Sequence, residues 1–420
     1  MAVATVTGAL PALSNIPPHP VDMKASFFFS LLSASLPLVA VTPLCAQEST
    51  PWVTTTVNGA EYISLNSIQS FYKLTAVDNK GKSAQQIIRN SCFSLSVTPG
   101  ERVATISGYK VRLTAPVIQD EQGVLYLSET DLVKLIDPIL RPTYIAERRE
   151  VKTVIIDPGH GGADTGCKIP AGNESDYTLK LALELAEALK TQGFNVVLTR
   201  SGNYYINDTQ RVEIAKNTPD AIFVSLHLNT GRSDMAGVET YCAAPLMPGK
   251  RTLDCHRHDA ANTALAFTLH THLVHATQAY DRACHRAHYT LLNTLNCPAV
   301  IVIPGYASND KEAADLSTDA YRAKMVKALT AGIVVFRDAI RPGAQITNPA
   351  PIITEPEPPV TEATPEPKPE PENKQTKPTK KTTTKSSGSS SSKKQNKKTS
   401  NNKSKSKNSS KKNKKSRKRR

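Results

Sequence analysis

The sequence has no pair of cysteines in a CxxC arrangement, although it contains seven cysteines in 420 residues. This absence argues against a zinc ribbon and against a thioredoxin-like redox centre, because both need two cysteines at that spacing. No stretch is long and apolar enough to form a stable membrane span. The function therefore has to be sought in other residue types.

The last part of the chain has no acidic and no aromatic residues. Residues 374–420 contain 20 Lys and Arg, whereas the whole chain has a net charge of +15, so everything before this segment sums to about −5. Such a segment cannot bury enough apolar surface to fold, and it is predicted to be a disordered basic tail. We expect it to bind anionic envelope polymers or a membrane surface, and its lack of aromatic residues argues against specific nucleic-acid recognition. Residues 342–373, rich in Pro, Glu and Thr, predict an extended linker before it.

The first residues resemble an export signal. Residues 1–22 carry no Lys or Arg, and a short basic and apolar segment begins at Met23, which is the expected true start within a signal region of residues 1–46. A lipoprotein attached through Cys45 is the alternative. We expect an exported protein of the periplasm or cell envelope. The six cysteines that remain after cleavage could form up to three disulfides or stay as buried thiols.

The stretch around His160 joins a buried strand to a turn. Val154–Ile156 form a continuous β-branched run, which is typical of a strand covered on both faces. Pro158 and Gly159 end this strand, and the two glycines after the histidine allow a tight turn. A histidine at the carboxyl end of a sheet strand is well placed to bind a metal or a substrate. Taken alone, the stretch is equally compatible with an ordinary glycine-rich turn.

Two later segments add a carboxylate and a second histidine. Glu174 lies at the start of an amphipathic helix, and His227 follows the apolar strand Ala221–Leu226. Two histidines and one carboxylate are the ligand set of a catalytic zinc site that leaves a fourth position for water. The alternative for Glu174 is a helix-start carboxylate that only complements the helix dipole.

In combination, these residues resemble the zinc-dependent N-acetylmuramoyl-L-alanine amidases of the type-3 family, which cleave peptidoglycan. The resemblance runs from about residue 152 to residue 340. It implies that His160, Glu174 and His227 bind one Zn²⁺ ion, and that the chain hydrolyses the amide bond between N-acetylmuramic acid and L-alanine. The matching motifs are DPGHGG at 157–162 with Asp164 and Gly166, SLHLN at 225–229, GVETY at 237–241, PAVIV at 298–302 and GYASN at 305–309.

One position departs from the family. The family has a glutamate that serves as general base just before the Gly-aromatic turn, and this sequence has Ile303 there. Isoleucine cannot transfer a proton, so the catalytic residue is unknown, and Glu239 and Glu312 are weak substitutes that could also be purely structural. The first hypothesis is an amidase with impaired turnover. The second is a non-catalytic, zinc-containing peptidoglycan-binding or regulatory protein, and the third is an envelope protein whose function is the basic tail.

Three further residues are candidates for binding the substrate: Asn229, Arg282 and Arg286. The two arginines fall where the family has a basic segment near the peptide, and stem peptides carry carboxylates that an arginine can bind in a bidentate manner. Ordinary surface salt bridging is the alternative. Histidines are also frequent from His256 to His288, where we expect a polar groove wall rather than a second metal site.

The predicted fold class is α/β. Strands and helices alternate over residues 150–341, which predicts a mixed, mostly parallel sheet flanked by helices and interrupted by an insertion at 245–258. Short strand and helix patterns over residues 51–145 predict a small α+β module that precedes this domain. The module has no catalytic constellation. We expect it to pack against the zinc domain or to position substrate, with direct cell-wall binding as the alternative.

Overall fold

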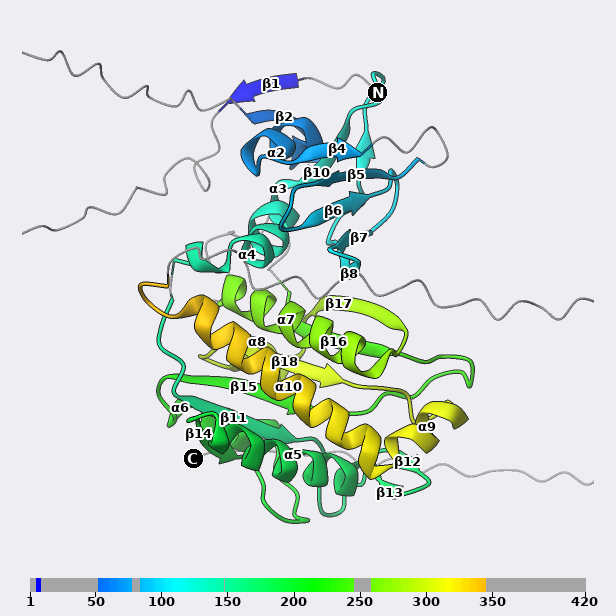
Figure 1. The fold of residues 1–420 in the computed structure, drawn as a ribbon, viewed down its shortest axis with the longest axis vertical. Coiled ribbons are helices and arrows are strands. Elements are labelled where there is room, and N and C mark those ends of the chain that lie inside the picture. The colour runs from blue at the N-terminus through cyan, green and yellow to red at the C-terminus, as the bar shows by residue number, and fades with distance from the viewer. Residues whose placement is uncertain (1–4, 9–51, 78–83, 147, 245–257, 345–420) are drawn as a thin grey trace, which may run out of the picture. The chain divides into compact units, whose positions relative to one another are not determined.

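The computed structural model describes residues 5–8, 52–77, 84–146, 148–244 and 258–344 (Figure 1). Almost all of the predicted signal region and linker, all of the basic tail and most of the insertion at 245–258 lie outside these residues and stay predictions. Within the described part of the chain, no helix has both the length and the apolar character needed to cross a bilayer.

The residues before Val151 form short strands and helices, as their turn-separated patterns predict. Two serine N-caps help to define the helices, because Ser64 and Ser128 each accept a hydrogen bond from a backbone N–H three residues later. The bounds are β1 (Thr5–Gly8), β2 (Trp52–Val57), β3 (Ala60–Ser64), α2 (Leu65–Phe71), β4 (Thr75–Val77), β5 (Gln86–Arg89), β6 (Ser94–Val97), β7 (Val103–Ile106), β8 (Tyr109–Arg112), β9 (Ile118–Gln119), β10 (Leu125–Ser128), α3 (Glu129–Asp131), a π-helical turn (Leu132–Ile136), α4 (Asp137–Leu140) and a 3₁₀ turn (Pro142–Tyr144).

The following residues alternate between strands and helices, which confirms the predicted α/β class. The predicted strands and helices of this region all form, with ends that differ by a few residues. The bounds are β11 (Thr153–Pro158), β12 (Lys168–Ile169), β13 (Gly172–Asn173), α5 (Glu174–Thr191), β14 (Asn195–Leu198), α6 (Asp208–Lys216), β15 (Ala221–Leu226), β16 (Val238–Ala243), α7 (Asp259–Thr277), β17 (Asp281–Ala287), α8 (Thr290–Thr294), β18 (Ala299–Ile303), α9 (Asp310–Leu316) and α10 (Asp319–Ile340).

The main sheet has the strand order β14-β11-β15-β18-β16-β17-β8-β7-β6-β5-β4. Strands β14, β11, β15 and β18 run parallel, and β16 pairs antiparallel with β18. Every residue of β11, β15 and β18 is buried, which explains why these strands have continuous apolar sequences. The carboxyl ends of β11 and β15 therefore lie side by side at one edge of the sheet.

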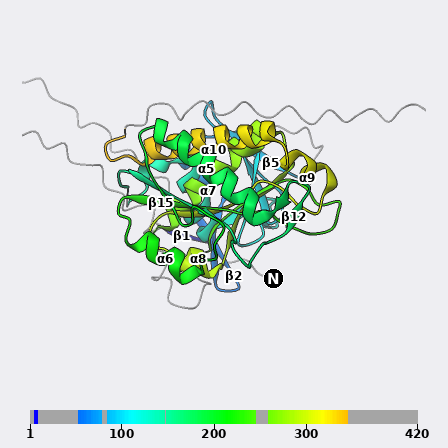
Figure 2. The same ribbon diagram turned by 90° about the horizontal axis from the view of Figure 1, so that it is seen from below.

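Helices cover both faces of this parallel part. Figure 2 shows α5, α7 and α10 on one side of the strands and α6 and α8 on the other. The packing of α10 against α7 is close at Gly332, where a Cβ atom would lie 2.8 Å from Leu269 Cδ2. On the opposite face, residues of α6 and α8 pack against Phe223 and Ile303 in a separate apolar cluster.

The sheet continues into the strands that precede residue 145. Strand β8 pairs in parallel with β17 through Val111 and Cys284. Next to this pair, Asp281 accepts a hydrogen bond of 2.8 Å from the backbone N–H of Lys110 and forms a hydrogen bond of 2.9 Å with the buried His270. Strands on both sides of the predicted boundary at residues 145–150 thus belong to one sheet. The division into two domains stays a prediction.

Candidate metal centre

Three elements converge at the carboxyl edge of the parallel strands. Pro158, the last residue of β11, pairs with Leu226, the last residue of β15, so the turns after both strands are neighbours. These turns present His160 and His227 side by side, and α5 begins at Glu174 next to them. The structure thus brings together the three side chains that the sequence analysis selected as metal ligands.

The donor atoms of these side chains lie within 4.8 Å of one another. Glu174 Oε1 is 3.0 Å from His160 Nε2 and 3.2 Å from His227 Nδ1. The two imidazole rings are nearly perpendicular, with centroids 4.9 Å apart. Two imidazole nitrogens and a carboxylate oxygen in this arrangement are donors that Zn²⁺ accepts, and the side chains of both histidines are partly exposed to solvent. The residues therefore fit a zinc ion.

Two glycines, Gly159 and Gly166, lie so close to the candidate ligands that a side chain at either position would collide with them. A Cβ atom on Gly159 would lie 2.3 Å from His227 Cε1, and one on Gly166 would lie 2.6 Å from Glu174 Oε2. His160 itself has a φ of +63°, in the left-handed region. A side chain at either glycine would displace a ligand, which explains the glycine-rich sequence of this turn.

The charges of the centre are set by hydrogen bonds. Burial raises the pKa of the Glu174 carboxyl, but bonds from both histidines and from the backbone N–H groups of Leu228 and Cys167 outweigh it and hold the pKa well below its usual range. The pKa of His160 is raised, chiefly by its hydrogen bond with Glu174. His160 Nδ1 lies 2.9 Å from Asp164 Oδ1, so Asp164 fixes the ring with Nε2 toward the other ligands.

Two arginines hold the strand ends that present the ligands, and the sequence analysis missed both. The side chain of Arg200 is buried and donates hydrogen bonds to the carbonyl oxygens of Pro158 and Gly159. Arg211 forms a buried ion pair with Asp157. An arginine placed directly after an apolar strand was the only sequence feature that could have identified Arg200.

The pairing of β18 with β16 shows which residue lies next to Ile303. Ile303 is 7% exposed and pairs directly with Glu239 on the antiparallel strand β16. The Cβ atoms of directly paired residues are about 4.5–5.5 Å apart and point to the same face of the sheet. Glu239 is therefore the immediate neighbour of the position at which the resemblance placed a glutamate.

The Glu239 carboxylate already has four hydrogen-bond partners. Burial raises its pKa, but bonds from Tyr306 (2.6 Å), Arg282 (2.8 Å), Tyr241 and Asn229 lower it below the usual value. Two of the predicted substrate-binding residues, Asn229 and Arg282, thus hold Glu239. The guanidinium of Arg282 also lies over the ring of Tyr306, and its side chain remains 26% exposed.

The other two candidates have structural partners. Glu312 accepts hydrogen bonds from the backbone N–H groups of Gly237 (2.7 Å) and Tyr306 (2.8 Å). Arg286 forms an ion pair of 2.9 Å with Asp259, and its side chain is only 1% exposed. Arg286 is thus held by Asp259 inside the structure, and its role in substrate binding stays a prediction.

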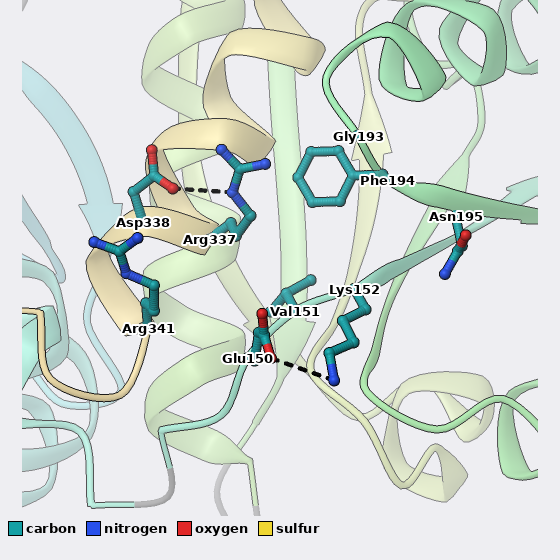
Figure 3. A pocket seen from close by; sticks show the side chains of 9 residues that line it. All are labelled: Glu150, Val151, Lys152, Gly193, Phe194, Asn195, Arg337, Asp338 and Arg341. Atoms are coloured by element: carbon teal, nitrogen blue, oxygen red, sulfur yellow. Dashed lines mark hydrogen bonds and ion pairs between the residues drawn. The ribbon is translucent and has the colours of Figure 1, made fainter.

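A separate pocket lies at the opposite edge of the sheet. It has a volume of about 450 Å³ and lies at the amino ends of β11 and β14, lined by Lys152 and Phe194 among others (Figure 3). Its charges largely neutralise one another, since Lys152 pairs with Glu150 and Arg337 with Asp338. None of the three candidate ligands lines it.

Residues 154–335 match the protein family described as N-acetylmuramoyl-L-alanine amidase. The chain therefore contains a type-3 amidase domain. An uncharacterised protein of Bacillus subtilis, YqiI, is 29% identical over 194 residues, which cover 46% of this chain and 88% of that protein. An uncharacterised cell wall amidase of Bacillus anthracis is 32% identical, and the match covers 44% of this chain but only 35% of that protein.

Solved structures include similar domains. The catalytic domain of CwlV, an N-acetylmuramoyl-L-alanine amidase from Bacillus (Paenibacillus) polymyxa var. colistinus, is 31% identical, with a TM-score of 0.40. The match covers 45% of this chain and 99% of that domain. The residues 154–335 that match the family include α5, β15 and nearly all of β11, which present the three candidate ligands.

Proposed function

We propose that the chain is an exported zinc amidase that hydrolyses the bond between N-acetylmuramic acid and L-alanine in peptidoglycan. The observation that supports this most directly is the convergence of His160, Glu174 and His227 within 4.8 Å in a type-3 amidase domain. The cell wall amidase of Bacillus anthracis and CwlV are similar to the amidase domain of this chain only. The reaction is therefore inferred for this chain from its own residues. Amidase homologues also include a cell wall amidase, which fits an envelope location.

The three ligands would hold zinc, which polarises an amide carbonyl and lowers the pKa of a bound water. The chain's own residues prepare this site. Asp164 orients the His160 ring, and the strongly lowered pKa of Glu174 keeps its carboxylate anionic at neutral pH. Arg282 is fixed by Glu239 and by the Tyr306 ring, and its exposed part can bind a carboxylate of the stem peptide.

Proton transfer is the step with no assigned residue. Glu239 is the nearest carboxylate to Ile303 in the register, but its ion pair with Arg282 and its lowered pKa make it a poor base. Glu312 is held by two backbone N–H groups. We infer that turnover is slow compared with an amidase that has the glutamate, because general acid–base help is worth about 10²–10⁴-fold in rate.

The burial of Ile303 in an apolar cluster supports a second candidate function, a non-catalytic peptidoglycan-binding protein that keeps its zinc site. One experiment separates the two. Purified peptidoglycan is incubated with the full chain, with added zinc or with a chelator, and the soluble products are analysed by mass spectrometry. Release of free stem peptides that stops with chelator establishes the amidase. No release by a protein that holds one zinc per chain establishes the binding protein.

The basic segment 374–420 is proposed to retain the protein at anionic envelope polymers or membrane surfaces. Such binding depends on charge and should weaken as the ionic strength rises, because the screening length falls to about 8 Å at physiological salt. A chain that lacks residues 374–420 should be released from isolated envelopes at lower salt than the full chain. If both chains are released from the envelopes at the same salt concentration, the basic segment does not retain the protein there.

A further inference from the structure

Two large exposed side chains lie beside the metal-binding turn. Tyr204 is 47% exposed and Tyr205 is 56% exposed. Both lie in the loop between β14 and α6, four and five residues after Arg200, whose side chain holds the backbone before His160. Exposed neighbouring aromatic residues of this kind are typical of binding surfaces.

Close contacts fix this loop against the turn. The backbone N–H of Gly162 donates a hydrogen bond of 2.8 Å to Asn203 Oδ1. A Cβ atom on Gly161 would lie 2.3 Å from the carbonyl oxygen of Tyr204, and one on Gly162 would lie 2.8 Å from the backbone nitrogen of Tyr205. The backbone that carries the two tyrosines therefore packs directly against the turn that carries His160, so a ligand on the tyrosines lies next to the metal centre.

A hydrogen bond within the loop orients one of the two rings. The hydroxyl of Tyr204 accepts a hydrogen bond of 3.1 Å from the backbone N–H of Ser201, within its own loop. This bond orients the ring of Tyr204, and the exposed parts of both tyrosine side chains are open to a ligand. Flat apolar faces suit the C–H faces of pyranose rings, which also present apolar, flat surfaces.

The strand order separates the two sides of the metal centre. Along the sheet, β14 precedes β11 and β15, which lead to His160 and His227, and β17 with Arg282 lies three strands beyond β15 (Figure 1). The proposed substrate bond, on which this inference rests, joins a sugar to a peptide. If the peptide carboxylate lies toward Arg282 and the substrate runs along the strand ends, the sugar lies toward the loop after β14, where the two tyrosines are.

We propose that Tyr204 and Tyr205 form a stacking platform for the glycan strand and place its muramic acid residue at the metal centre. A stacked aromatic contact contributes enough to change affinity several-fold, so removal of both rings should weaken glycan binding about tenfold. Catalysis does not enter this estimate, because the rings contact the sugar and not the reacting amide.

The probe for the test is the N-acetylglucosamine tetramer, a neutral glycan that the basic segment cannot bind by charge. Binding to the full-length zinc-loaded chain is measured by titration calorimetry or by chemical-shift changes of the sugar. The double variant Tyr204→Ala/Tyr205→Ala should bind about tenfold more weakly, whereas Tyr205→Phe and Tyr205→Trp should bind as the wild type does. Tyr144→Ala is the matched control, because Tyr144 is 41% exposed and stacks on Arg141 away from the metal centre.

Equal binding by the double variant and the wild type, or no binding by the wild type, would overturn the platform. Loss of binding in Tyr205→Phe would also overturn it, because that result would show a hydroxyl contact in place of stacking. The amidase proposal fails separately, when the wild type releases no stem peptide from peptidoglycan. A platform without hydrolysis and hydrolysis without a platform are therefore distinguishable outcomes.

Discussion

Replacing Ile303 with glutamate should convert a slow amidase into a faster one. The variant restores a carboxylate at the position where the resemblance to the type-3 family implies a general base. The pairing of Ile303 with Glu239 places the new carboxylate next to an existing one. At a separation of about 6 Å and an effective dielectric constant of about 20, the repulsion is on the order of 3 kcal/mol. Arg282 reduces this value, because it already neutralises much of the Glu239 charge.

This repulsion favours the function of a base. It raises the pKa of the new carboxyl above its usual value, toward the range in which a carboxylate is an efficient base at neutral pH. The expected gain in the rate of stem-peptide release is about 10²–10⁴-fold. The free energy of unfolding should fall by about 2–3 kcal/mol, because the variant gives up the burial of an isoleucine side chain that is only 7% exposed.

The assay compares three variants on purified peptidoglycan by mass spectrometry of the released peptides. Ile303→Gln has nearly the shape of the glutamate variant but cannot transfer a proton. Ile301→Glu places a carboxylate on the same face two residues farther from the metal centre, opposite Tyr241. If Ile303→Glu is folded, binds zinc and is no faster than Ile303→Gln, the reasoning about the missing base is wrong.

Four further outcomes are expected. His227→Ala should lower the zinc content from one per chain to nearly none by elemental analysis, whereas Asp164→Asn should keep the site but weaken zinc affinity about 10–100-fold in a competition titration. Gly159→Ala should also weaken zinc binding, since its Cβ would meet the His227 ring at 2.3 Å; an unchanged affinity would show that the turn can shift. Glu239→Gln should destabilise the chain at neutral pH and flatten the pH dependence of stability in acid. The lowered pKa of Glu239 means that its contribution is complete above the unfolded-state pKa of about 4.3 and is lost as the pH falls through the folded-state pKa. Urea unfolding at several pH values measures this, and parallel curves for wild type and variant would contradict it.

The sequence alone predicted the elements whose apolar pattern is regular. Strands β11, β15 and β18 are continuous apolar runs because they are buried on both faces, and α5 has a repeating apolar stripe because only one of its faces is buried. Strand β17 was missed, since its sequence Asp-Arg-Ala-Cys-His-Arg-Ala has charged residues that find partners in other elements. Such partners compensate polar residues inside a sheet, and no local pattern indicates them.

The candidate metal ligands were predictable from local sequence because the two histidines follow the ends of buried strands and Glu174 begins an amphipathic helix, and the ends of neighbouring parallel strands meet at one edge. The surroundings of these ligands depend on pairings between residues far apart in the chain. Only the antiparallel register of β16 and β18 places Glu239 opposite Ile303 and reveals that its carboxylate is held by four partners. In the same way, only the packing of α7 against β17 shows that Arg286 is buried against Asp259, because charge in a sequence does not reveal whether the side chain reaches solvent.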